Sequence, residues 1–146
     1  MGVQQASDFL ENAIVDWIFR TRTPAKPAAL WVALFTAAPS DVGGGTEVAG
    51  GGYARVNLPP LDTNWTATQG GTTGNSSGTG GMTQNAVAVA YAAPSANWGT
   101  ITHFAIFDAA SGGNMLIWDA LTAPRTVLGG DPAPSFAVGQ LQILVA

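Results

Sequence analysis

The segment from Trp98 to Trp118, WGTITHFAIFDAASGGNMLIW, constrains the fold more than any other part of the chain. It contains two apolar runs of strand length on either side of the turn Ala109–Asn114, which includes a Gly-Gly pair. Apolar runs joined by a short, glycine-containing turn are typical of a β-hairpin. The sequence therefore predicts antiparallel strands over Thr100–Asp108 and Met115–Leu121. Nothing in the turn itself is suited to chemistry.

Further strands are expected on both sides of this hairpin. The continuous apolar run Leu30–Phe35 is typical of a strand that is buried on both faces. Tyr53–Leu58 alternates apolar and polar residues, as a half-buried strand does. Gln84–Ala93 predicts a strand with an alanine face, which should lie close to a second sheet or a subunit. Ser135–Ala146 predicts a terminal strand, and Pro124 should interrupt the chain before it.

One amphipathic helix is expected near the start of the chain, over about residues 8–20. Ser7 is a suitable N-cap, and Pro24 lies beyond the expected end. An apolar stripe recurs at helical spacing: Phe9, Leu10, Ala13, Ile14, Trp17 and Ile18. In the simpler interpretation, this stripe covers one end of a β-sheet core. In the other, the helix packs around a symmetry axis against copies of itself, because Val15 and Phe19 widen the apolar arc.

One helix and six or seven short strands predict a mainly β chain. The expected architecture is an antiparallel β-sandwich or a jelly-roll-like barrel, with one N-terminal amphipathic helix and long Gly-rich loops. A chain of 146 residues fits a single domain over residues 1–146, with the sandwich over about residues 28–146. The Gly/Ser/Thr-rich segment 66–81 is too biased for an element and predicts an excursion from the sandwich.

Charge is scarce, at 10% of residues, and the net charge is −4. Nucleic-acid binding depends on several phosphate contacts by cations, and the chain has few cations: Arg20, Arg22, Lys26, Arg55 and Arg125. We therefore expect no nucleic-acid partner. The sequence predicts no membrane partner either, since no apolar run is long enough to span a bilayer. Arg20 and Arg22 lie at the expected helix end, where they complement the helix dipole or form a salt bridge to a partner.

Catalytic and metal-binding patterns are absent from the sequence. His103 is the single histidine, and it lies within an apolar strand, where a packing role is expected. There is no cysteine, and the nine acidic residues are scattered. No G-x-S-x-G motif is present. The sequence therefore predicts a protein that is not an enzyme and has no cofactor and no metal site, with calcium held by loop carboxylates as the alternative.

The five tryptophans divide into two groups. Trp17, Trp31 and Trp118 lie within apolar elements and are expected in the core. Trp65 and Trp98 each follow an asparagine in a loop or at a strand edge. These two either pack over the ends of the sandwich or form a surface for a partner or a glycan.

Three motifs carry a resemblance to a known family: LWVALF at residues 30–35, GGGYARV at 50–56 and WGTITHFAIFDAASGG at 98–113. They resemble a family of small bacteriophage virion proteins, whose members are labelled tail-fibre-like, minor tail or capsid-decoration proteins. The resemblance covers most of the chain and brings no catalytic residues with it. The Gly/Ser/Thr-rich excursion departs from the family's general pattern.

The resemblance implies a virion structural protein that is assembled in the host cytoplasm. A capsid decoration or cement protein is expected first, bound to the outer surface of the head, with the major capsid protein and copies of itself in a trimer as partners. The alternative is a tail-fibre or tail-tip component that contacts a host-surface receptor or glycan. The interface candidates are Val15, Phe19, Arg20, Arg22, Trp65 and Trp98.

Overall fold

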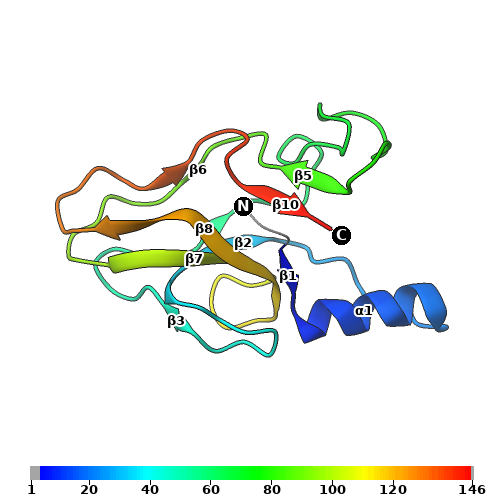
Figure 1. Ribbon diagram of the computed structural model, residues 1–146, viewed down its shortest axis with the longest axis horizontal. Helices are drawn as coiled ribbons and strands as arrows, with labels where there is room; N and C mark the ends of the chain where they lie inside the picture. Colours follow the sequence, from blue (N-terminus) through cyan, green and yellow to red (C-terminus); the bar gives the residue numbers. More distant parts are fainter. Residues whose placement is uncertain (1–3, 146) are drawn as a thin grey trace.

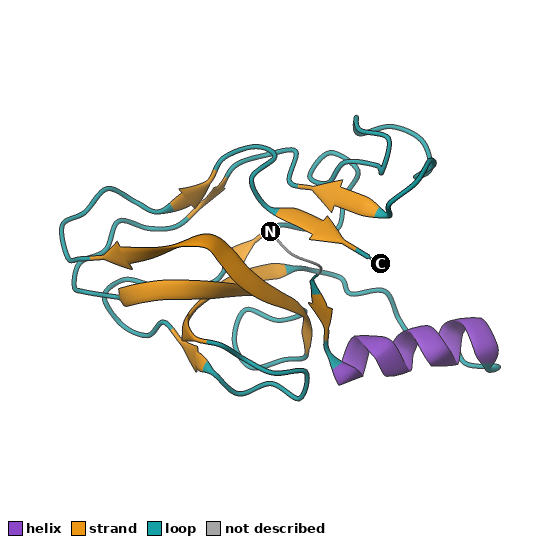
Figure 2. Ribbon diagram, viewed as in Figure 1, coloured by secondary structure: helices purple, strands orange, loops and turns teal. Residues whose placement is uncertain are grey.

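The computed structural model describes residues 4–145 and is mainly β (Figure 1). Long loops connect short strands, and one helix lies near the N-terminus (Figure 2). In chain order the elements are β1 (Gln5–Ala6), α1 (Asp8–Phe19), β2 (Trp31–Ala37), β3 (Thr46–Glu47), β4 (Val56–Asn57), β5 (Met82–Gln84), β6 (Val89–Ala90), β7 (Gly99–Phe107), β8 (Met115–Val127), β9 (Ser135–Phe136) and β10 (Gln142–Leu144).

The hairpin predicted from the sequence is the centre of the main sheet. Strands β7 and β8 pair antiparallel, with Ile106 opposite Ile117, and β2 pairs antiparallel with the other edge of β7. The strand order is β1-β8-β7-β2-β3, and the short β4 also pairs with β2. Because β2 and β7 have neighbours on both sides, their residues are among the most buried, as the continuous apolar run Leu30–Phe35 predicts.

A second layer covers one face of this sheet. It consists of two short antiparallel pairs, β5 with β10 and β6 with β9 (Figure 1). Val89, Leu141 and Ile143 from this layer belong to the same buried cluster as Val32 and Phe104 from the main sheet. The mainly β, antiparallel fold with one N-terminal helix and Gly-rich loops is confirmed, and its two layers correspond to the expected β-sandwich.

The continuous strand predicted over Gln84–Ala93 is wrong, because Asn85 divides it into β5 and β6. The Asn85 side chain is fully buried. Its Nδ2 donates to the carbonyls of Val87 (2.8 Å) and Ala137 (2.9 Å), and its Oδ1 accepts from the Leu141 amide (2.9 Å). Asn85 itself keeps one isolated antiparallel bridge, to Trp65, and the bonds of its side chain hold the bend at residues 86–87 that separates β5 from β6. The alanine face is also exposed within the single chain, so it does not pack on a second sheet.

Two other expected strands are shorter than predicted. Within Tyr53–Leu58, only Val56 and Asn57 pair with β2. The C-terminal strand predicted from residue 135 is divided between β9 and β10, because a turn intervenes at residues 138–140.

The interruption predicted at Pro124 is wrong, because β8 continues through it to Val127. The strand accommodates the proline in an irregular stretch of the ladder. Ile101 pairs with Arg125 and His103 pairs with Ala120, so that residues 121–124 all lie opposite Thr102. A bulge leaves residues without ladder partners, and the missing N–H of proline is tolerated there.

The Gly/Ser/Thr-rich segment leaves the sandwich as a long loop between β4 and β5 (Figure 1). Every residue from Gln69 to Gly81 is exposed. The Gln69 side chain organises the loop internally, since its Oε1 accepts from the Ser77 amide (2.8 Å) and its Nε2 donates to the Asn75 carbonyl (3.0 Å). The loop therefore has local order without contributing to the core.

Candidate assembly interface

Helix α1 is fixed to the sandwich at its first turn. Ser7 is the N-cap, as predicted: its Oγ accepts from the Leu10 amide (3.2 Å) and donates to the Met115 carbonyl. The Ser7 amide also donates to the carbonyl of Leu116, and the Asp8 amide donates to that of Asp41. These bonds hold the N-terminal end of α1 beside the start of β8.

The remainder of α1 extends away from the sheets, and its C-terminal end lies at the periphery of the molecule (Figure 1). None of its residues is buried. Five large apolar side chains on its second half are exposed, and we call them the helix patch: Ile14 (36%), Val15 (47%), Trp17 (68%), Ile18 (57%) and Phe19 (79%). A helix that is apolar around most of its circumference normally requires partners on several sides.

The interpretation that the apolar stripe of α1 covers one end of the core is therefore wrong, and so is the expected core position of Trp17. The direction of the helix explains both errors. Periodicity identifies which residues share a face, but the short connection through β1 and Ser7 directs the helix axis outward. Trp31 and Trp118 are partly buried, and Trp118 packs against the buried cluster that contains Phe35.

A mostly apolar groove of about 920 Å³ lies between the first half of α1 and the sandwich. Phe9, Leu10 and Ala13 form its helical wall. The opposite wall includes Leu61, which is 55% exposed, and Trp65. Further apolar lining comes from the strands and the C-terminal segment: Leu30, Ile106, Leu116, Ile117, Ile143 and Val145. Lys26, Asp62 and Asp108 supply charge.

Four of the six predicted interface residues lie together at the outer end of α1. Val15 and Phe19 belong to the helix patch. Arg20 is the helix C-cap and forms an exposed ion pair with Asp16 at 3.2 Å, while Arg22 is exposed just beyond it. Exposed pairs of this kind contribute little to stability, so these arginines remain suited to contacts with a partner.

The two predicted interface tryptophans lie apart from each other. Trp65 is partly buried, packs against the core and lines the groove, and its Nε1 donates to the Leu58 carbonyl (3.4 Å). Trp98 is only 5% exposed and stacks edge-on against Tyr53 and Tyr91. Its Nε1 donates to the Gly51 carbonyl (2.9 Å), so the side chain of Trp98 closes the core rather than forming an outer surface.

Sequence reasoning missed two parts of this region. The first is the outward face of the stripe, at Ile14, Trp17 and Ile18. The available signal was the run of apolar residues around the second half of the helix, which exceeds what one contact face requires. The second is Leu61 in the groove, an apolar residue in a Pro-Pro loop that no periodic pattern identifies.

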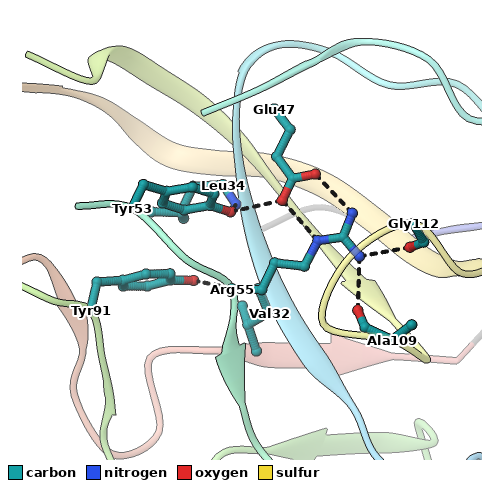
Figure 3. A network of polar contacts seen from close by, with 8 residues as sticks. All are labelled: Val32, Leu34, Glu47, Tyr53, Arg55, Tyr91, Ala109 and Gly112. Atoms are coloured by element: carbon teal, nitrogen blue, oxygen red, sulfur yellow. Dashed lines mark hydrogen bonds and ion pairs between the residues drawn. The ribbon is translucent and has the colours of Figure 1, made fainter. Parts of the chain in front are cut away.

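A polar network on the main sheet provides a contrast to this exposed region (Figure 3). Arg55 is 7% exposed at its side chain, and its Nε and Nη2 donate to the two carboxylate oxygens of Glu47, both at 2.8 Å. Its Nη1 donates to the carbonyls of Ala109 (2.8 Å) and Gly112 (2.9 Å), and its guanidinium lies 3.7 Å above the Phe107 ring. Arg55 therefore clamps the turn between β7 and β8.

Two tyrosines extend this network toward the core. The Tyr53 hydroxyl donates to Glu47 Oε1 (3.0 Å) and accepts from the Leu34 amide (2.9 Å), and the Tyr91 hydroxyl donates to the Val32 carbonyl (3.0 Å). Burial raises the pKa of Tyr53 and of Tyr91 well above the usual tyrosine value, and the nearby Glu47 charge acts in the same direction. Both phenols are therefore neutral structural groups.

The arrangement shows no constellation for catalysis or metal binding within residues 4–145. No three histidine or carboxylate side chains gather there into a possible metal site. The imidazole Nδ1 of His103 is hydrogen-bonded to the Thr102 hydroxyl at 2.8 Å, and its ring packs beside Trp118. No helix among these residues has the length and apolar character needed to cross a membrane.

Comparison with known proteins agrees with the motif resemblance. A family model described as podophage GP4 fiber I protein gp80 matches residues 5–144, which includes α1, both layers and the loop between β4 and β5. No curated protein matches the chain. Since the match spans nearly the whole sequence and the fold has the architecture that the resemblance implied, the chain belongs to the family of the podophage GP4 fiber I protein gp80.

Proposed function

We propose that this protein is a structural component of a phage fibre and that it joins the virion through helix α1 and the adjoining groove. Its family makes it a bacteriophage structural protein. The observation that carries the proposal is the helix patch, which leaves five large apolar side chains in solvent on a helix with no buried residue. Large exposed apolar surfaces on small proteins mark interaction sites.

The helix patch is large enough to contribute substantially to assembly. Full burial of a large apolar side chain contributes about 1.5–3 kcal/mol. The five side chains of the helix patch are 36–79% exposed, so their burial contributes on the order of 4–9 kcal/mol, which lies within the cost of about 4–15 kcal/mol for association. The scarcity of charge, at 10% of residues, fits an interface core, where charged residues are depleted. A non-enzymatic role is supported by the family as well.

The copy number and the location of this chain in purified virions test the fibre proposal. Quantitative mass spectrometry against the major capsid protein should give a few copies per particle, and labelled antibodies should bind at the tail. A ratio to the capsid protein near one, or a fixed simple fraction of it, with label over the head, would contradict a fibre role.

Capsid decoration is the second candidate, with the major capsid protein and copies of this chain in a trimer as partners. The exposed alanine face around β6 favours it, because small side chains permit close approach of a neighbouring subunit. If the protein is a cement, heads that lack it should burst at lower temperature or lower stress than complete heads. Heads of unchanged resistance would exclude cementing. In both candidates the chain is a single virion domain, assembled in the host cytoplasm.

Host contact would use Trp65 and the exposed loop from Gln69 to Gly81, because Trp98 is buried. Binding of the purified protein to host cells or their glycans should then be lost in Trp65→Ala. The Trp98→Ala variant serves as a folding control, since it should lose stability instead. Absence of binding at high protein concentration would exclude this contact.

A further inference from the structure

We propose that α1 pairs antiparallel with α1 of a second copy around a twofold axis, so that Ile14, Trp17 and Ile18 of each helix patch cover the groove of the other. The proposal deepens the assembly role given above and rests on it. Its partner is a second copy of this chain, and the pairing is reciprocal.

One chain carries both halves of the contact, the groove and the helix patch, but cannot bring them together. The first half of α1 forms one wall of the groove through Phe9, Leu10 and Ala13. The helix patch lies on the second half of the same helix, and none of its residues lines the groove. Since a helix is straight over this length, its second half cannot fold back into its own groove. A second copy supplies what is missing, and an apolar helix in an apolar groove is a recurrent mode of recognition.

The two ends of α1 are opposite in charge. Its first turn carries Asp8 and Glu11, and no basic residue lies in its last turn. Arg20 and Arg22 follow directly after its end. In an antiparallel pair, the acidic end of each helix lies beside the basic end of the other, and opposite charges meet at both ends of the contact. The groove itself carries charges of both signs, at Lys26, Asp62 and Asp108, so the two helix ends supply the charge complementarity.

The charges at the two ends of α1 distinguish this pair from a parallel association such as a trimer. Parallel helices around a common axis would place the Asp8 and Glu11 carboxylates of all copies together, and likewise their Arg20 and Arg22 guanidiniums. Like charges that are brought close together repel. The existing ion pair of Arg20 with Asp16 does not oppose the antiparallel contact, because it is exposed and readily exchanged.

The cysteine-free sequence allows a direct test of direction. In an antiparallel pair centred near Ile14, the two Ile14 positions face each other across the axis. The two Phe19 positions are then separated by about 15 Å along the helices, because each residue advances 1.5 Å. A disulfide requires Cα atoms within about 7 Å. Purified Ile14→Cys should therefore form a covalent dimer under mild oxidation, and Phe19→Cys should not.

Sedimentation of the purified full chain provides the second measurement. We expect a mass of twice 14.8 kDa, with dissociation on dilution. Trp17→Glu with Ile18→Glu should weaken the dimer by about 30-fold or more, as loss of a central tryptophan does at interfaces. The matched control is Leu128→Glu with Val138→Glu, since these side chains are 48% and 61% exposed but lie outside α1 and the groove. Near-ultraviolet circular dichroism from the buried Trp98 verifies folding in each variant.

Charge reversal provides the third measurement. Arg20→Glu with Arg22→Glu, and separately Asp8→Arg with Glu11→Arg, should each weaken self-association. Mixing the two variant proteins should restore a dimer, because both ends of the mixed contact are again of opposite sign.

A trimer, a covalent Phe19→Cys dimer, or a chain that remains monomeric at high concentration would overturn the antiparallel pair. So would a mixture of the two charge variants that associates no better than either alone. None of these outcomes changes the copy number or the location in the virion. These experiments therefore distinguish failure of the pairing from failure of the fibre proposal.

Discussion

The turn held by Arg55 and the outer half of α1 differ in which of their groups are in contact with the rest of the chain. At the turn, a nearly buried cation has a carboxylate, two carbonyls and an aromatic ring around it. At the helix, five large apolar side chains have solvent around them. No buried side-chain polar atom lacks a hydrogen bond in the described part of the chain. Folding of a single chain thus satisfies the polar groups and leaves apolar surface to be covered by assembly.

The largest expected effect comes from the same substitution made in the folded core and on the exposed helix. Phe104 is fully buried and packs edge-on against Phe136, whereas Phe19 is 79% exposed. Phe104→Ala should lower the free energy of unfolding by about 3–5 kcal/mol, because it leaves a cavity. Phe19→Ala should change it by less than about 0.5 kcal/mol. Urea denaturation measures both at a concentration where the chain is monomeric. Equal losses would mean that α1 is part of the folding core.

The next effect compares the two ion pairs. Glu47→Gln removes the charge that faces the buried Arg55, and we expect a loss of about 2 kcal/mol in unfolding free energy. Asp16→Asn removes the exposed partner of Arg20 and should cost less than about 0.5 kcal/mol. Denaturant midpoints measured in low and high salt check both values. A small loss in Glu47→Gln would show that the clamp is dispensable for folding.

A smaller effect should appear at alkaline pH. Burial raises the pKa of Tyr53 and Tyr91 in the folded chain, so the unfolded chain releases these phenolic protons first, near pH 10. Stability is therefore complete below pH 10 and falls above it, by about 1 kcal/mol per tyrosine at pH 10.5. Urea midpoints from pH 8 to 11 measure this loss. The Tyr91→Phe variant should show a shallower decline, and an unchanged slope would exclude Tyr91 as a source.

The parts of this fold that sequence analysis predicted are those set by local pattern. The hairpin of β7 and β8, the buried β2 and the N-cap at Ser7 depend on periodicity and short-range hydrogen bonding. The parts it missed depend on distant residues. Asn85 interrupts a regular alternation only because Ala137 and Leu141 meet its side chain.

The candidate interface was likewise predictable only where local pattern determines it. The sequence showed that α1 is apolar on an unusually wide arc, and this identified Val15 and Phe19. It contains no signal for the direction in which the helix leaves the sandwich, because that direction is set by contacts of β1 and Ser7 with β8. The burial of Trp98 could not be predicted from the sequence, because it results from packing against the rings of Tyr53 and Tyr91, which are distant in the chain.

The hydrogen bonds of Asn85 also carry a consequence for synthesis. Its partners at Ala137 and Leu141 lie more than fifty residues later, so the centre of the chain stays unfinished until those residues are translated. Contacts of such long sequence separation form slowly. The residues of helix α1, in contrast, all precede Asn85 and are translated well before its partners. A nascent chain therefore exposes the apolar side chains of the helix patch before its core can close.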